Sequence, residues 1–242
     1  MNKTDMNKGG NPAPLMRGAV ALLDVEGTTT PIAFVKEVLF PFARARMATF
    51  VTERASEPAV AAEIAAVAKE LGAARPDPAA AVHALLAWSD ADRKVTPLKS
   101  LQGMIWKQGY ESGALQGPVF EDAVAQLRVW KERRVPVFIY SSGSVAAQKL
   151  LFRYSDHGDL LPLLAGHFDT TAGGKLEAGS YATIAGRIGF PAAKVTFFSD
   201  HAGEVRAAAE SGMTGVLLRR PGEVPPLSGP WSGTTVVTLA GF

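Results

Sequence analysis

Short apolar runs and helical patterns alternate along most of this chain. Four runs contain almost no polar side chain, and they lie at residues 19–23, 135–140, 195–198 and 215–218. Unbroken apolar runs of this length are typical of strands that are covered on both faces. Between the later runs, Ser144 can cap a helix that continues through Leu151, and two further helical patterns stop at Gly189 and Gly212. Strands that alternate with helices predict an α/β fold with a Rossmann-like parallel sheet.

The segment 41–117 breaks this alternation. It is rich in Ala, contains no strand pattern, and carries an amphipathic stripe with apolar residues at i, i+4, i+7 and i+11. The stripe consists of Val60, Ile64, Val67 and Leu71. We therefore predict an all-helical cap domain, inserted between the first and second core motifs. The α/β core would comprise residues 18–40 and 118–242, and residues 1–17, rich in Asn, Gly, Pro and Lys, would form a disordered tail.

The composition excludes several classes of protein. Hydrophobic residues make up 47% of the 242 residues and charged residues 20%, which is typical of a folded chain. The net charge is +2 with Lys and Arg scattered, so we expect no binding to nucleic acid or to an anionic membrane. No apolar run approaches the ~18–20 residues of a membrane span, and the first residues contain no apolar signal core. The absence of cysteine excludes disulfides and thiolate zinc sites. We expect a cytoplasmic monomer that acts on a small molecule.

Two carboxylates follow the first apolar run, in the sequence DVEGTTTP at residues 24–31. Ligands of open α/β sheets bind beyond the carboxyl ends of the strands, which is where Asp24 lies. Carboxylates two residues apart can divide the chemistry, one as nucleophile or metal ligand and the other, Glu26, as general acid and base. Taken alone, the pair favours a simpler interpretation in which Asp24 begins a turn and Glu26 is solvated, because carboxylates are common at strand ends.

A cluster of hydroxyls, Ser141, Ser142 and Ser144, closes the second apolar run and opens a helix. Hydroxyls beside the free amides of a helix N-terminus can bind an anion such as phosphate. The simpler interpretation is a cluster of N-cap residues, which the motif taken alone favours. The sequence does not match the G-x-S-x-G elbow, so it gives no support to a serine hydrolase.

Lys175 and Asp200 complete the candidate chemistry. Lys175 follows two glycines, but the sequence is not a P-loop, and a lone loop lysine is usually solvated. Asp200 ends a buried run and has Glu204 one helical turn further on, so it can equally be a helix cap. Asp24 and Asp200 together can hold a hard cation such as Mg²⁺, which prefers oxygen ligands.

In this order, the four features resemble the four loop motifs of the haloacid-dehalogenase-type phosphohydrolase superfamily. Longer segments are similar to one family within it, the enolase-phosphatases, which are the acireductone synthases of methionine salvage. These segments are LLDVEGTTTPIAFVKEVLFP, IYSSGSVAAQKLLF, GHFDTTAGGKLEAGSY and, in the predicted cap, LKSLQGMIWKQGY. The resemblance covers roughly residues 18–220, and the sequence around the motifs is more specific than the motifs themselves.

The resemblance implies a role for each motif residue. Asp24 would be the nucleophile that forms an aspartyl-phosphate, and also a ligand of Mg²⁺. Glu26 would be the general acid and base, with its main-chain carbonyl on Mg²⁺, and Asp200 would complete the metal site. The phosphate would be held by Ser141, Ser142 and Lys175. Phosphoryl transfer needs in-line placement and neutralised oxygens, which a cation, a lysine and helix-end amides supply.

The implied reaction converts 2,3-diketo-5-methylthiopentyl-1-phosphate to the acireductone 1,2-dihydroxy-3-keto-5-methylthiopentene, by enolisation and then dephosphorylation. Glu26 departs from the Asp that is commoner in the superfamily but matches the enolase-phosphatase pattern. The sequence does not identify the base for enolisation. Two alternatives stay open at this point: a capped phosphatase for another small phosphate ester, and a non-catalytic α/β module that binds Mg²⁺.

Overall fold

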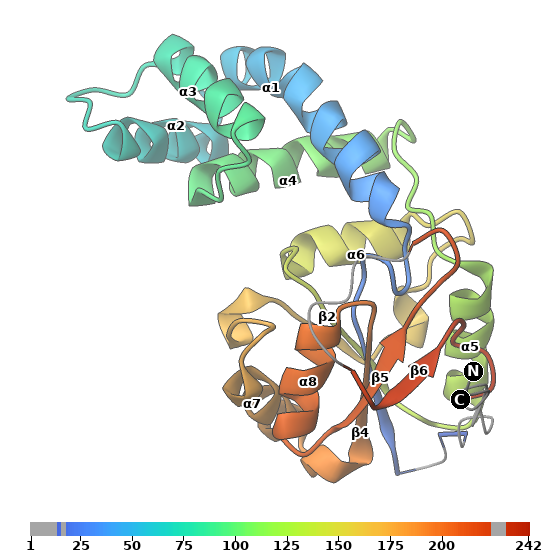
Figure 1. Ribbon diagram of the computed structural model, residues 1–242. Coiled ribbons are helices and arrows are strands. Elements are labelled where there is room, and N and C mark those ends of the chain that lie inside the picture. Colours follow the sequence, from blue (N-terminus) through green and yellow to red (C-terminus); the bar gives the residue numbers. More distant parts are fainter. Residues whose placement is uncertain (1–13, 16–17, 224–230) are drawn as a thin grey trace, which may run out of the picture. The chain divides into compact units, whose positions relative to one another are not determined.

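The computed structural model describes residues 14–15, 18–223 and 231–242, so most of the predicted tail at residues 1–17 lies outside the described residues (Figure 1). The chain divides into two compact units. The sheet unit comprises the described residues up to Pro31, Val119–Gln148 and Asp159–Phe242. The helical unit comprises Ile32–Pro118 and Lys149–Gly158, and so contains the segment 41–117 together with a second, later segment of the chain.

Six parallel strands form the sheet. They are β1 (Val20–Leu23), β2 (Val137–Tyr140), β3 (Gly166–Phe168), β4 (Val195–Ser199), β5 (Thr214–Leu218) and β6 (Thr234–Val236). The strands lie in the order β3-β2-β1-β4-β5-β6, and each neighbouring pair is parallel. This is the strand order of the doubly wound Rossmann sheet. The predicted α/β fold class is therefore confirmed.

The four apolar runs form the four inner strands, β2, β1, β4 and β5. The edge strands β3 and β6 were not predicted. Each has only three residues, and its side chains are partly or largely exposed. A short strand at a sheet edge buries too little surface to need an unbroken apolar run, so the pattern carries no signal for it.

Helices cover both faces of the sheet, with α7 (Ala178–Ile188) and α8 (Ala202–Glu210) on one face and α5 (Glu121–Glu132) on the other (Figure 1). Successive residues of β4 show why both faces must be apolar. Phe197 contacts Tyr181 of α7 with ring centroids 5.0 Å apart, whereas Phe198 contacts Trp130 of α5 at 5.7 Å. Because side chains alternate along a strand, a sheet covered on both sides favours apolar residues on both of its faces.

The helical unit is built around four helices, which are α1 (Phe40–Glu53), α2 (Pro58–Glu70), α3 (Pro78–Asp90) and α4 (Thr96–Glu111). A π-helical turn over Phe34–Leu39 leads into α1. Three residues of the predicted stripe, Val60, Ile64 and Val67, are buried in the core of this unit. The prediction that Leu71 belongs to this buried stripe is wrong, because Leu71 follows the end of α2 and is 47% exposed.

The remaining helical segments are α6 (Val145–Arg153) and three short turns at Leu161–Leu163, Thr170–Ala172 and Ala192–Lys194. The predicted stops are confirmed. Gly189 ends α7 in the left-handed conformation at φ +78°, and Gly212 follows α8 at φ +91°. No helix in the described part of the chain is long and apolar enough to cross a membrane.

Candidate active site

Three neighbouring strands bring their carboxyl ends to one edge of the sheet, and each is followed by a predicted site residue. Asp24 follows β1, Ser141 follows β2, and Asp200 follows β4. Since the three strands are adjacent in the order β2-β1-β4, these residues lie at one place although they are far apart in sequence. The strand order reverses beside β1, which is where ligands bind in open α/β sheets.

The loop after β1 is folded into a tight turn. The main-chain carbonyl of Val25 accepts hydrogen bonds from the amides of the three following threonines, at 3.2, 2.8 and 3.0 Å. Gly27 has φ +72°, and a Cβ added to it would collide with the carboxylate of Asp200. Both the backbone conformation and the close approach therefore require glycine at this position. The turn holds the loop directly against Asp200.

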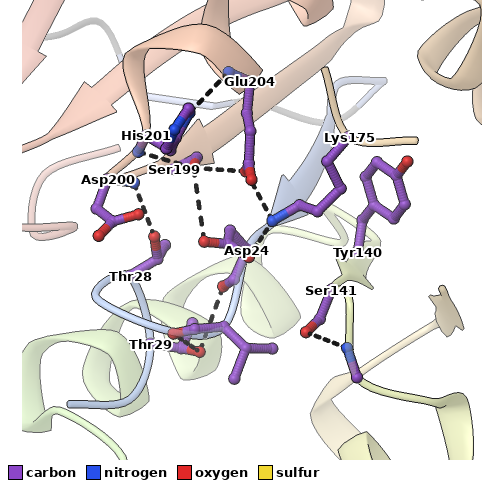
Figure 2. A network of polar contacts seen from close by, with 12 residues as sticks. Asp24, Thr28, Thr29, Tyr140, Ser141, Lys175, Ser199, Asp200, His201 and Glu204 are labelled. Carbon is purple, nitrogen blue, oxygen red and sulfur yellow. Dashed lines mark hydrogen bonds and ion pairs between the residues drawn. The ribbon is translucent and has the colours of Figure 1, made fainter. Parts of the chain in front are cut away.

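Lys175 is the centre of a buried ion-pair network (Figure 2). Its Nζ lies 2.5 Å from Asp24 Oδ1 and 2.6 Å from Glu204 Oε2, and its side chain is only 8% exposed. The hydroxyl of Tyr181 donates to the Lys175 carbonyl at 2.7 Å, and Tyr140 places its ring 5.8 Å from Nζ. The interpretation of Lys175 as a solvated loop residue is therefore wrong.

Glu204 was not among the predicted site residues, although it belongs to the network. It lies in the first turn of α8, and its carboxylate accepts a hydrogen bond from the Ser199 hydroxyl at 2.9 Å. Ser199 Oγ also lies 3.5 Å from Asp24 Oδ2. The available signal was the spacing of an Asp at a strand end and a Glu one helical turn later, which points both carboxylates toward the same edge.

The site carries more negative charge than Lys175 can balance. Burial, and then the charges of Asp24 and Glu204, raise the pKa of Asp200 to about 7. Burial, and then the charge of Asp24, also raise the pKa of Glu204 to about 7, and Lys175 offsets only part of this rise. Burial opposes the charge of Lys175, but Asp24 and Glu204 outweigh it and hold the pKa of Lys175 above its usual range. This excess of negative charge is what a bound cation would offset.

The loop after β2 presents Ser141 and Ser142 in different environments. Ser141 is buried and its hydroxyl accepts a hydrogen bond from the amide of Gly143 at 3.1 Å, whereas Ser142 is exposed. The loop is stabilised by the side chain of Gln148, which is only 3% exposed. Gln148 Nε2 lies 2.8 Å from both the Gly143 and the Phe168 carbonyls, so it ties the loop to β3.

Glu26 lies in the same turn as Asp24 and is half-buried. Its main chain pairs with that of Thr30, and its negative charge contributes to the raised pKa of Asp200. The side chain is therefore close enough to act at the same site. His201, next to Asp200, caps α8, where its Nδ1 accepts from the Glu204 amide at 3.3 Å.

The oxygen donors at this edge fit a hard divalent cation. The described residues contain no group of three His, Cys, Asp or Glu side chains gathered to hold a metal. The site does contain two buried carboxylates, Asp24 and Asp200, and the main-chain carbonyls of the turn that follows β1. Two carboxylates with a carbonyl and water is a ligand set that Mg²⁺ accepts, and it would relieve the excess negative charge.

The fold and this site define the class of the protein. A family model described as haloacid dehalogenase-like hydrolase matches residues 19–212, and the chain belongs to this family. Within it, the chain is 53% identical over 201 residues to Enolase-phosphatase E1 of Pseudomonas aeruginosa (strain UCBPP-PA14), covering 83% of this chain and 89% of the relative. It is 52% identical over 197 residues to Enolase-phosphatase E1 of Parvibaculum lavamentivorans, covering 81% and 84%.

Solved structures share the fold of this chain. The UTR4 protein of Saccharomyces cerevisiae is 35% identical, with a TM-score of 0.80, and the similarity covers 93% of this chain and 100% of that one. A dehalogenase with 18% identity and a TM-score of 0.52 shares the fold alone. The predicted enzyme class, a phosphatase of the enolase-phosphatase family, is confirmed, and the non-catalytic module is excluded. The family implies a divalent metal.

Proposed function

We propose that this protein is a Mg²⁺-dependent bifunctional enolase-phosphatase of methionine salvage. It converts 2,3-diketo-5-methylthiopentyl-1-phosphate to 1,2-dihydroxy-3-keto-5-methylthiopentene, and it works in the cytoplasm as a monomer. The observation that carries the proposal is the pairing of buried Asp24 with Lys175, beside Asp200 and in the same turn as Glu26. The names of the relatives point to the same reaction.

Dephosphorylation would use Asp24 as the nucleophile. Its carboxylate attacks the phosphorus in line with the bond to the substrate oxygen, so that an aspartyl-phosphate forms as that bond breaks. Glu26 gives a proton to the departing oxygen. It then takes a proton from water, whose oxygen attacks the same phosphorus, releases inorganic phosphate and restores Asp24.

The other residues prepare this step. Lys175 compensates the charge of Asp24 before the substrate binds and that of the phosphoryl oxygens afterwards, with Ser141 and Ser142 as additional donors. Asp24, Asp200 and the carbonyl of Glu26 would hold Mg²⁺, which neutralises phosphoryl oxygens and polarises a substrate carbonyl as a Lewis acid.

The decisive experiment separates the two half-reactions. Asp24→Asn removes the nucleophile but is nearly isosteric, so at saturating Mg²⁺ we expect the diketo phosphate to be enolised without release of phosphate. The phosphorylated enol would accumulate as new ultraviolet absorbance. Glu26→Gln should lose phosphate release, and loses enolisation as well only if Glu26 is the base. Asp90→Asn is the matched control, because Asp90 pairs with Arg44 on the exposed surface of the helical unit.

Two results would contradict the proposal. Substantial phosphate release by Asp24→Asn would remove Asp24 from its role. A wild-type enzyme that hydrolyses simple aryl phosphates in Mg²⁺ but not in EDTA, yet leaves the diketo phosphate unchanged, would refute the substrate and leave a general phosphatase.

A further inference from the structure

The C-terminal segment of the chain reaches the active-site loop through Arg220. This residue lies outside the range matched by the family model and follows β5. It is only 7% exposed, and its guanidinium lies over the ring of Phe120 at 4.2 Å. Arg220 Nε donates to the main-chain carbonyl of Thr28 at 3.0 Å, a contact that spans 192 residues of sequence.

Thr28 connects this contact to Asp200. While its carbonyl accepts from Arg220, its side-chain Oγ1 accepts a hydrogen bond from the Asp200 amide at 3.1 Å. Thr28 is fully buried and is next to Gly27, which lies directly against the Asp200 carboxylate. Arg220, Thr28 and Asp200 therefore form one continuous chain of contacts.

Asp122 holds the other side of the guanidinium. Its Oδ1 accepts from Arg220 Nη1 at 2.7 Å, and its Oδ2 accepts from the Thr238 hydroxyl at 2.6 Å and the Leu239 amide at 2.8 Å. Arg220 therefore cannot leave Thr28 without also breaking its ion pair with Asp122, which in turn bonds Thr238 and Leu239.

This arrangement is costly for a residue that serves stability alone. Arg220 Nη2 is buried and has no hydrogen-bond partner among the described residues. A buried ion pair with an unsatisfied donor is often no more stabilising than apolar side chains of the same volume. The specific gain is geometric, because a planar guanidinium can bond Thr28 and Asp122 at once with a fixed angle between them.

We propose that Arg220 is a positioning residue for the metal site, which acts through Thr28 to fix the main chain at Asp200. The proposal rests on the proposed function in one respect only, the assignment of Asp200 as a Mg²⁺ ligand. Residues that hydrogen-bond to the ligands of a metal and so orient them typically contribute about tenfold to a hundredfold to metal affinity.

The test measures metal binding in the full-length protein without substrate. Mg²⁺ affinity is determined by calorimetry, and amide hydrogen exchange of Asp200 is followed by NMR in the metal-free protein. Arg220→Lys keeps the charge but loses the planar guanidinium, whose Nε and Nη1 bond Thr28 and Asp122 as separate donors. Thr28→Val removes only the side-chain acceptor. We expect both variants to bind Mg²⁺ about ten to a hundred times more weakly, with faster exchange at Asp200. Thr28→Ser restores the hydroxyl and should rescue both readouts.

Two comparisons distinguish positioning from a structural role. Arg219→Lys makes the same change one residue away and should leave Mg²⁺ affinity unchanged. The double variant Arg220→Lys, Thr28→Val should bind Mg²⁺ no more weakly than Thr28→Val, because both changes break the same chain of contacts.

The proposal is overturned if Arg220→Lys unfolds more easily but retains wild-type Mg²⁺ affinity and Asp200 exchange, or if the losses in the double variant add. Should Arg220→Lys fail to fold, Thr28→Val and Thr28→Ser still decide whether the contact to Asp200 controls metal affinity. Failure of the wild-type enzyme to act on the diketo phosphate refutes the proposed substrate and leaves these Mg²⁺ measurements valid.

Discussion

Replacing Lys175 with methionine tests the electrostatic account of the site most directly. Lys175 pairs with both Asp24 and Glu204, and the side chains of the three residues are only 8%, 7% and 14% exposed. An exposed ion pair is worth about 0–1 kcal/mol, but removing one partner of a buried pair costs about 3–5 kcal/mol, since it leaves an uncompensated charge. Because Lys175→Met leaves two such carboxylates, we expect the free energy of unfolding to fall by about 3–5 kcal/mol.

The measurement is urea denaturation in EDTA at neutral pH, so that metal cannot replace the lost charge. Lys131→Met is the matched control, because Lys131 is exposed and its Nζ donates to the main-chain carbonyl of Pro162. This change should cost less than about 1 kcal/mol. The decisive comparison is between Lys175→Met and the double variant Lys175→Met, Glu204→Gln. If uncompensated charge is the cause, the second change removes part of it and recovers about 1–3 kcal/mol.

Two outcomes would refute this reasoning. A loss below about 1 kcal/mol for Lys175→Met would mean that the carboxylates are solvated and the network contributes little. A double variant less stable than Lys175→Met would mean that Glu204 stabilises the fold independently of Lys175. In either case Lys175→Met should still lose phosphate release if Lys175 binds the phosphoryl group, which a parallel phosphate assay measures.

Three further predictions follow from the geometry. In Gly27→Ala the alanine must adopt φ +72° and its Cβ would collide with the Asp200 carboxylate. The variant should therefore lose about 1–2 kcal/mol of stability together with Mg²⁺ affinity, and a Mg²⁺ affinity equal to that of the wild type in calorimetry would contradict this. Gln148→Leu removes the side-chain amide that bonds both the Gly143 and the Phe168 carbonyls, although Phe168 keeps the Ser141 amide as a donor. Inhibition by inorganic phosphate should therefore weaken while Mg²⁺ affinity is kept, and unchanged inhibition would disprove the support of the loop. Leu85→Ala empties a fully buried position of the helical unit and should cost about 2–5 kcal/mol in denaturation, but should not change Mg²⁺ affinity, because the proposed ligands all lie in the sheet unit.

The strand ends of the site could be predicted because each of them is marked locally. Asp24 and Ser141 come directly after an apolar run and Asp200 follows one residue later, and the structure places all three after buried inner strands. Burial on both faces favours apolar residues along such a strand, so the polar residues that follow the run mark its end. The edge strands β3 and β6 lack this constraint and left no pattern.

Residues that act through distant contacts could not be predicted in the same way. Lys175 was placed in the site by resemblance alone, because nothing in its loop shows that it will be buried against Asp24, 151 residues away. Gln148 and Arg220 look like ordinary polar helix and loop residues, and they reach the loops of the site through main-chain carbonyls, those of Gly143 and Thr28, that any sequence would supply. A hydrogen bond to the main chain leaves no complementary residue type in the partner segment.

The local sequence pattern specifies which segments become inner strands, where these strands end, and which carboxylates and hydroxyls lie at the edge of the sheet. Three features depend on how the whole chain folds: β2, β1 and β4 are neighbours, Lys175 is shared between Asp24 and Glu204, and Arg220 bonds Thr28. The difference lies in the range of the interactions. Hydrophobic patterns and helix caps depend on residues a few positions apart, so they can be recognised in the local sequence. Strand order and buried ion pairs arise only when segments far apart in the sequence pack together and exclude water between them.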